Sequence, residues 1–171
     1  MKYLIIDIGN TNIVFAVYDN NKIMKKWRIS TLINRTKDEY IIWLNSILKG
    51  DTDFTEIIIG SVVPDITEEL KIAISDYLKK KPLVIAEDIK VNFPSELDSP
   101  SEVGTDRIVN ALCAWHIYKK PAVIIDFGTA TTFDIVGENG VYLGGVIAPG
   151  ANLSINALHT AAARLPRIAI T

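Results

Sequence analysis

Apolar residues in the first thirty positions fall into short runs separated by turns, a pattern that predicts an antiparallel meander. Residues 4–8 read as a buried strand, and residues 13–18 as a second strand after the turn Gly9-Asn10-Thr11-Asn12. After another turn, residues 23–29 complete the meander. The third strand is expected to pack three side chains, namely Met24, Trp27 and Ile29.

The next elements alternate between helix and strand. Thr36 and Glu39 form a capping-box pair at the start of a helix that Gly50 is placed to end. A β-branched strand at residues 56–61 leads into a helix whose apolar positions share one face, and a strand at 83–85 follows. Those positions are Ile66, Leu70, Ile74, Tyr77 and Leu78. The order predicts a mixed sheet covered by helices.

The periodic pattern breaks between residues 87 and 102, where proline and serine are frequent. Such a stretch is typical of an irregular connection, so we expect a linker between two lobes that also forms one wall of a cleft. The predicted domains are therefore residues 1–100, with the first meander and the linker, and residues 101–171.

The second half repeats the beginning of the first. The runs Ile6-Asp7-Ile8-Gly9 and Ile125-Asp126-Phe127-Gly128 each follow an apolar strand and lead through a turn into another strand. Strands at 132–136 and 142–148 rebuild the meander, and a helix is expected at about 151–163. No strand, helix and strand follow before residue 171, so the second lobe is expected to be incomplete.

Composition narrows the class of protein. Hydrophobic residues make up 49% of the 171 residues and charged residues 22%, the balance of a chain that buries a core. A formal charge of -2 supplies no field for holding nucleic acid. No apolar run is long enough for a membrane span and no signal peptide is recognisable, so a cytoplasmic location is expected. Cys113 is expected to be a small buried hydrophobe.

Candidate chemistry begins at the two Asp-x-Gly turns. Backbone N–H groups of a tight turn can face a polyphosphate, but carboxylates at Asp7 and Asp126 then need cations between them and the phosphate oxygens. The alternative for either turn is that it merely closes a hairpin. Threonine and asparagine near both turns suit phosphate binding: Thr11, Asn12, Thr129, Thr131 and Thr132. Gly144-Gly145 and Pro149-Gly150 either admit a nucleotide closely or mark a bulge and a turn.

A third candidate lies where the irregular segment enters a helix, at Gly104-Thr105-Asp106-Arg107. Asp106 could accept the proton of an attacking hydroxyl while Arg107 pairs with an anionic group of the acceptor. The alternative is an ordinary first-turn acid beside a solvated arginine. His116 and His159 lack the spacing of metal ligands and are expected to be structural or at the surface.

Four motifs in series resemble type III pantothenate kinases. They are Asp7-Ile8-Gly9-Asn10-Thr11-Asn12, Gly104-Thr105-Asp106-Arg107, Asp126-Phe127-Gly128-Thr129-Ala130-Thr131-Thr132 and Gly144-Gly145-Val146-Ile147-Ala148-Pro149-Gly150, with Leu165-Pro166-Arg167 extending the likeness to the end of the chain. The resemblance implies an α/β fold of two duplicated ribonuclease-H-like lobes, as in acetate kinases, sugar kinases, actin and Hsp70, the second lobe here being truncated. It also implies a homodimer.

The activity implied by the resemblance is ATP-dependent phosphorylation of the primary hydroxyl of pantothenate, the first step of coenzyme A synthesis. Asp106 would be the general base, and Gly104, Thr105 and Arg107 would hold pantothenate. ATP, with Mg²⁺, would be held by Asp7, Ile8, Gly9, Asn10, Thr11, Asn12, Ile13, Val14 and Thr129. Asp126 would hold the monovalent cation, K⁺ or NH₄⁺, that this family needs.

The chain departs from the family pattern in two respects. Leu97 stands where the family has a tyrosine that packs on pantothenate, and typical members continue well beyond residue 171. Two other functions stay open on the same scaffold. One is a non-catalytic nucleotide-binding or regulatory protein, and the other is a different small-molecule phosphotransferase.

Overall fold

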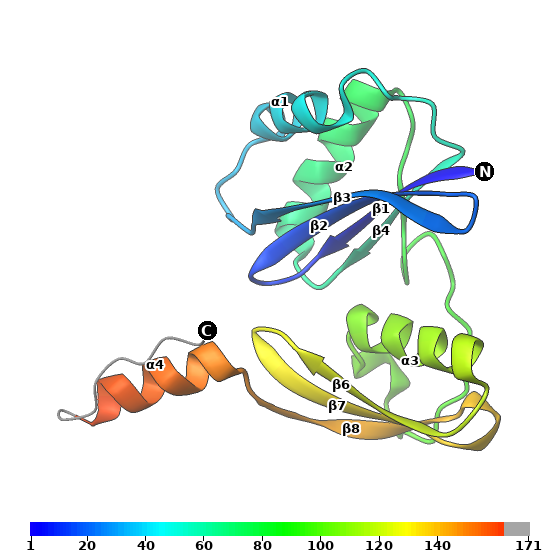
Figure 1. The fold of residues 1–171 in the computed structure, drawn as a ribbon, viewed down its shortest axis with the longest axis vertical. Helices are drawn as coiled ribbons and strands as arrows, with labels where there is room; N and C mark the ends of the chain where they lie inside the picture. The colour runs from blue at the N-terminus through cyan, green and yellow to red at the C-terminus, as the bar shows by residue number, and fades with distance from the viewer. Residues whose placement is uncertain (163–171) are drawn as a thin grey trace. The chain divides into compact units, whose positions relative to one another are not determined.

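The computed structural model describes residues 1–162, which form two compact units, Met1–Val91 and a second unit that begins at Asn92. Figure 1 shows the elements of each unit. The predicted boundary between residues 100 and 101 stays a prediction. Residues 94–96 are tied to β8 within the second unit, since Tyr142 N–H donates to the Pro94 carbonyl and Glu96 N–H donates to the Tyr142 carbonyl.

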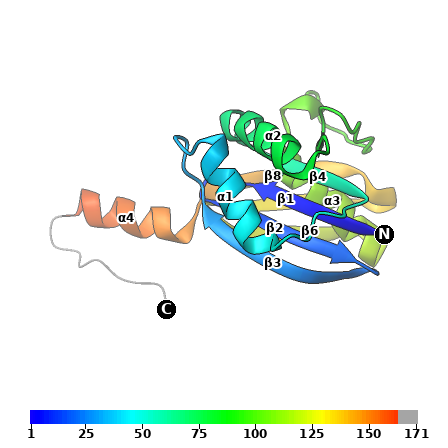
Figure 2. The same cartoon turned by 90° about the horizontal axis from the view of Figure 1, so that it is seen from above.

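The first unit is a five-stranded mixed sheet in the order β3-β2-β1-β4-β5. Its meander comprises β1 (Lys2–Ile8), β2 (Asn12–Asp19) and β3 (Lys22–Ser30), all antiparallel. β4 (Glu56–Ser61) and β5 (Leu83–Val84) extend the sheet with parallel pairing. Two helices, α1 (Lys37–Leu48) and α2 (Pro64–Leu78), cover one face of this sheet, as Figure 2 shows.

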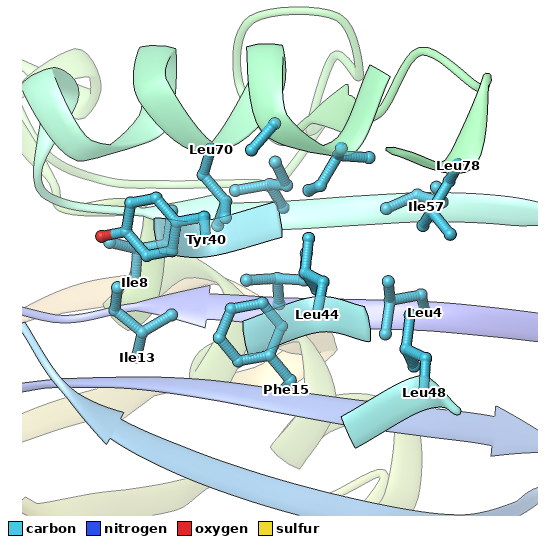
Figure 3. Packing of buried hydrophobic residues seen from close by; sticks show 14 of the residues in the cluster. Leu4, Ile8, Ile13, Phe15, Tyr40, Leu44, Leu48, Ile57, Leu70 and Leu78 are labelled. Carbon is cyan, nitrogen blue, oxygen red and sulfur yellow. The ribbon is translucent and has the colours of Figure 1, made fainter. Parts of the chain in front are cut away.

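The core of the first unit lies between that sheet face and the two helices. Figure 3 shows strand residues meeting the apolar faces of α1 and α2. The alternation of β1 buries every second residue, so the core-facing side chains of β1 are fully buried: Leu4, Ile6 and Ile8. They meet the helical residues Tyr40, Leu44, Leu48, Leu70 and Leu78. The Thr36 capping box is formed as predicted, with both reciprocal hydrogen bonds present.

The second unit repeats the meander in a three-stranded antiparallel sheet. β6 (Ala122–Phe127), β7 (Ala130–Val136) and β8 (Tyr142–Pro149) pair in sequence order, and the short helix η2 (Glu138–Gly140) joins β7 to β8. The short helix η1 (Pro100–Glu102) and α3 (Thr105–Tyr118) precede the sheet, and α4 (Ala151–Ala161) follows it. The predicted class, α/β with a duplicated meander plus helices, is confirmed.

Two expectations about single side chains were wrong. Met24 is 60% exposed, because it lies at the register shift between β2 and β3 and has no partner residue there, whereas Trp27 and Ile29 do pack against the core. Cys113 is exposed, because α3 turns Ile108 and Ala111 toward the sheet and Cys113 away from it.

The repeat leaves one apolar sheet face uncovered in the described residues. Val123, Ile125 and Phe127 match Leu4, Ile6 and Ile8 in the repeat, yet these residues are 62%, 48% and 80% exposed. α3 packs on the opposite face, against Ile124 and Tyr142 among others.

We expect Ile6→Ala and Ile125→Ala to differ sharply in cost despite their matched positions. Ile6→Ala should lower the free energy of unfolding by about 2 to 5 kcal/mol, since it leaves a cavity in a packed core. Ile125→Ala should cost at most about 1 kcal/mol, the span of strand propensity. Urea unfolding of both variants measures the difference. Equal costs would mean that the β6 face is covered in solution.

Candidate functional site

The first Asp-x-Gly turn is held by three hydrogen bonds. Gly9 N–H donates to the Asn12 carbonyl at 3.0 Å, while the Thr31 hydroxyl donates to the Gly9 carbonyl at 2.6 Å and Thr31 N–H to the Thr11 carbonyl at 2.9 Å. Asp7 is exposed, on the sheet face opposite the core, and lies beside Gly60 of β4. The turn therefore presents a carboxylate next to a fixed backbone loop.

The residues around this turn differ in what they can offer a ligand. Asn10 and Thr11 are exposed, whereas the side chains of Ile8 and Ile13 are fully buried in the core. Only the backbone groups of these two isoleucines can therefore reach a ligand. Val14 pairs with Asp7 across the hairpin and is half-buried.

The second Asp-x-Gly turn is closed by the end of β8. Asp126 is exposed at the end of β6, and the Asn110 side chain of α3 donates to its Oδ2 at 3.2 Å. Gly150 N–H donates to the Thr129 carbonyl at 3.2 Å, and a Cβ at Gly150 would lie only 2.3 Å from that oxygen. Gly150 thus allows this chain's own backbone to approach the turn.

Gly144 serves a different purpose from Gly150. It has φ +108, in the region that side chains rarely adopt, and it lies where the pairing of β7 with β8 shifts register at Ile135. Gly144 is thus a bulge residue. A Cβ there would lie 3.2 Å from Leu97 Cδ2, and Leu97 itself packs against the small core of the second unit.

The start of α3 holds the third candidate. Gly104 is the N-cap residue and provides no side-chain cap, and Asp106 is exposed in the first turn. Oδ1 of Asp106 accepts the backbone N–H of Arg107 at 2.8 Å. An acid in the first turn is stabilised by the positive end of the helix dipole, and this hydrogen bond also fixes the direction of the carboxylate. Both roles foreseen for Asp106 stay compatible with the geometry.

Arg107 is not the solvated arginine of the alternative interpretation. Its side chain is only 15% exposed, and its Nε donates to Oδ1 of Asp134 at 2.7 Å. Asp134, on β7, is completely buried and also accepts the Tyr142 hydroxyl at 2.6 Å. Sequence reasoning missed Asp134 and Tyr142. The available signal was a carboxylate at an inward position of β7, in phase with Thr132 and Val136.

Tyr142 has a perturbed hydroxyl. Burial, followed by the hydrogen bond to Asp134 and the charge of that carboxylate, raises the pKa of Tyr142 to about 12. The neutral phenol is therefore the form that the folded protein favours. A neutral phenol can donate its proton to Asp134, whereas a phenolate would repel it.

This shift makes stability depend on pH above 10. Between about pH 10 and about 12 the unfolded chain has released the Tyr142 proton and the folded chain has kept it, so the free energy of unfolding falls as pH rises. The fall attributable to this residue should be about 3 kcal/mol. Urea unfolding of wild type and Tyr142→Phe at pH values below and above 10 measures it. A variant as steep as wild type would contradict the assignment.

Neither a preformed metal cluster nor a membrane-spanning helix occurs in the described part of the chain. No group of three or more His, Cys, Asp or Glu side chains within residues 1–162 is arranged to hold a metal ion. No helix in that range is long and apolar enough to cross a membrane. Leu165-Pro166-Arg167, the last run of the resemblance, lies outside the described residues.

Comparison with solved structures shows the fold. A Ppx/GppA phosphatase from Aquifex aeolicus, in its type II variant, superposes with a TM-score of 0.55 at 14% identity, covering 94% of this chain and 55% of that one. The ethanolamine utilization protein EutJ from Carboxydothermus hydrogenoformans gives 0.50 at 13% identity, covering 98% and 58%. At these identities the likeness concerns architecture alone.

Comparison at the sequence level shows the family. The family model described as type III pantothenate kinase matches residues 3–171. Proteins called type III pantothenate kinase from Acidiphilium cryptum and Rhodospirillum rubrum are 50% and 49% identical, each over 98% of this chain. The chain spans 64% and 67% of the length of these two relatives. The resemblance carried by the four motifs is thereby confirmed, and the chain belongs to the type III pantothenate kinase family.

Proposed function

We propose that this chain takes part in ATP-dependent phosphorylation of the primary hydroxyl of pantothenate to 4′-phosphopantothenate, the first step of coenzyme A synthesis. The observation that carries the proposal is the family match over residues 3–171, which includes all four motifs. The chain spans 64% of the length of the relative from Acidiphilium cryptum, so the activity of the whole protein is a proposal. We place it in the cytoplasm, as a homodimer.

ATP phosphates are assigned to the two Asp-x-Gly turns. The first turn, residues 7–14, offers backbone N–H groups together with the side chains of Asn10, Thr11 and Asn12, and Thr129 offers a hydroxyl at the second turn. Because Ile8 and Ile13 are buried, their contribution would be limited to backbone groups.

Mg²⁺ fits this donor set. In phosphotransferases Mg²⁺ is usually held by one or two carboxylates plus phosphate oxygens and water, so a cluster of three protein ligands is not needed. Asp7 is an exposed carboxylate beside the first turn and would supply such a ligand. When bound, the ion would neutralise charge that develops on the phosphate oxygens.

Asp126 fits a monovalent cation, K⁺ or NH₄⁺. Its carboxylate is exposed near the end of β6, directly before the second turn, and hard oxygen donors of this kind suit such a cation. The Asn110 amide, which donates to Oδ2 at 3.2 Å, would keep the carboxylate turned toward that position.

Asp106 is assigned as the general base and Arg107 as a contact for the pantothenate carboxylate. Asp106 is exposed and oriented by the Arg107 N–H, so it can accept the proton of an incoming hydroxyl. Gly104 and Thr105 would hold the substrate through their backbone. Leu97 would make an aliphatic contact with pantothenate where the family has a tyrosine.

A coupled assay with pantothenate, ATP, Mg²⁺ and K⁺ tests the proposal. The expected result is ADP release that depends on pantothenate, with phosphate transferred to its primary hydroxyl. Nucleotide binding without turnover would favour a non-catalytic protein, and turnover with another acceptor hydroxyl would favour a different phosphotransferase. Either outcome would defeat the assignment.

A further inference from the structure

Asp134 is the one residue with a completely buried carboxylate among the described residues. Three donors surround it: Arg107 Nε at 2.7 Å and the Tyr142 hydroxyl at 2.6 Å on Oδ1, and the Thr132 hydroxyl at 3.3 Å on Oδ2. Burying a charge is costly unless it is paired and hydrogen-bonded, and here both conditions hold. The four side chains come from α3, β7 and β8, so this contact joins the helix to the sheet.

A buried ion pair of this kind adds little to stability compared with apolar packing, but it restricts orientation strongly. Tyr142 supports that restriction. Its ring is edge-on to Phe93 at 5.9 Å between centroids, and the ring is packed in the small core of the second unit. A phenol held in this way can donate only toward Asp134, which leaves the carboxylate little freedom to turn.

One nitrogen of the Arg107 guanidinium has no hydrogen-bond partner in the described residues. This nitrogen is Nη2, which is buried. The group lies over Gly145, where a Cβ would be 2.3 Å from Nη2 and 3.0 Å from Oδ1 of Asp134. The missing side chain at residue 145 therefore makes the space in which the guanidinium lies. Buried polar groups in folded proteins are nearly always hydrogen-bonded, so a buried donor without a protein partner marks a place that water or a ligand group can fill.

We propose that Asp134, fixed by Tyr142, is a positioning residue that orients the Arg107 guanidinium toward the carboxylate of the acceptor substrate. The inference rests on the proposed function. Asp134 itself does not touch the substrate. It accepts the Nε–H of Arg107 and so leaves Nη2, which has no protein partner in the described residues, for the acceptor carboxylate.

This arrangement predicts selectivity for a carboxylate. Pantothenate and its alcohol analogue, in which the carboxylate is replaced by a primary alcohol, share the hydroxyl that is phosphorylated. Only pantothenate can use the positioned guanidinium. A defect in Asp134 should therefore weaken pantothenate binding and leave binding of the alcohol nearly unchanged.

Titration calorimetry of the 171-residue chain with both compounds is the test. Asp134→Asn keeps the size of the side chain but removes its charge, and should raise the Kd for pantothenate by about 10- to 100-fold, the range of a hydrogen bond to a charged group. Tyr142→Phe should fold normally and give a smaller rise. Asp76→Asn removes an exposed ion pair with Lys37 in the other unit and should have no effect.

A double-mutant cycle tells positioning from general damage. If Asp134 acts through Arg107, Asp134→Asn should add nothing to the Kd in an Arg107→Gln background. An equal rise in both backgrounds, or an equal loss for pantothenate and the alcohol, would overturn the proposal. Thermal melting of each variant shows whether a loss of binding reflects a loss of fold.

A measurement without ligand keeps the two proposals apart. Nuclear magnetic resonance can follow the exchange of the Arg107 Nε–H proton with water. This exchange should be slow in wild type and at least about 10-fold faster in Asp134→Asn, which is the factor expected for the loss of one charge-assisted hydrogen bond. If wild type binds neither compound, the proposed function fails while this exchange still tests the role of Asp134. Unchanged exchange would overturn that role even if pantothenate binds.

Discussion

Asp106→Asn should reduce kcat by roughly 10²- to 10⁴-fold, the range for loss of a general base. The amide has the same size as the carboxylate and can still accept the Arg107 N–H through its oxygen, so α3 should form normally. It cannot take the proton of the attacking hydroxyl, however. ATP binding should hardly change, because Asp106 is assigned to the acceptor. Steady-state kinetics and nucleotide titration, in a parent protein shown to be active, provide the measurement.

Asp38→Asn is the matched control for this substitution. Asp38 occupies the same position in α1, two residues after the N-cap Thr36, that Asp106 occupies after the N-cap Gly104 in α3. Both are exposed acids in a first turn, so Asp38→Asn reports the cost of losing charge at a helix start, about 0.3 to 1 kcal/mol. If the Asp106 variant also kept full turnover and lost only this stability, Asp106 would be a helix-start acid and not a base.

Asp126→Ala should abolish activation by monovalent cations. The variant loses the only anionic ligand that we assign to the ion, so its rate in K⁺ should fall to the rate that wild type shows without K⁺. The initial rate as a function of K⁺ concentration, at constant ionic strength, measures this. An unchanged K⁺ dependence in the variant would remove Asp126 from the cation site.

Asn110→Ala serves as the comparison. It removes the amide that contacts Oδ2 of Asp126 and keeps the carboxylate. Activation by K⁺ should therefore persist in this variant, shifted to higher K⁺ concentration because the carboxylate is less well oriented. Equal loss of activation in both variants would indicate that the second turn had been disturbed, whatever the role of Asp126.

Local sequence determined most of the elements in both units. Periods of two and of about 3.6 residues are properties of the chain itself, and they predicted β1, β2, α1 and α2 within a few residues. The capping box of Thr36 and Glu39 was predictable because both hydrogen bonds form within one turn. The repeat of Asp-x-Gly was visible for the same reason, since each copy is a contiguous run. Together with the other two motifs, which are also contiguous, it was enough to indicate the family.

Only the tertiary structure decided what surrounds those runs. Asp134 and Arg107 are 27 residues apart, and nothing in the sequence near either one indicates that strand and helix bring them together. The roles of Gly145 and Gly150 likewise depend on atoms of other segments, namely the Arg107 guanidinium and the Thr129 carbonyl. The exposure of Val123, Ile125 and Phe127 also depends on which other segments pack against them, because their counterparts in β1 are buried. Burial and close approach are properties of packed surfaces, and residues distant in the sequence create those surfaces.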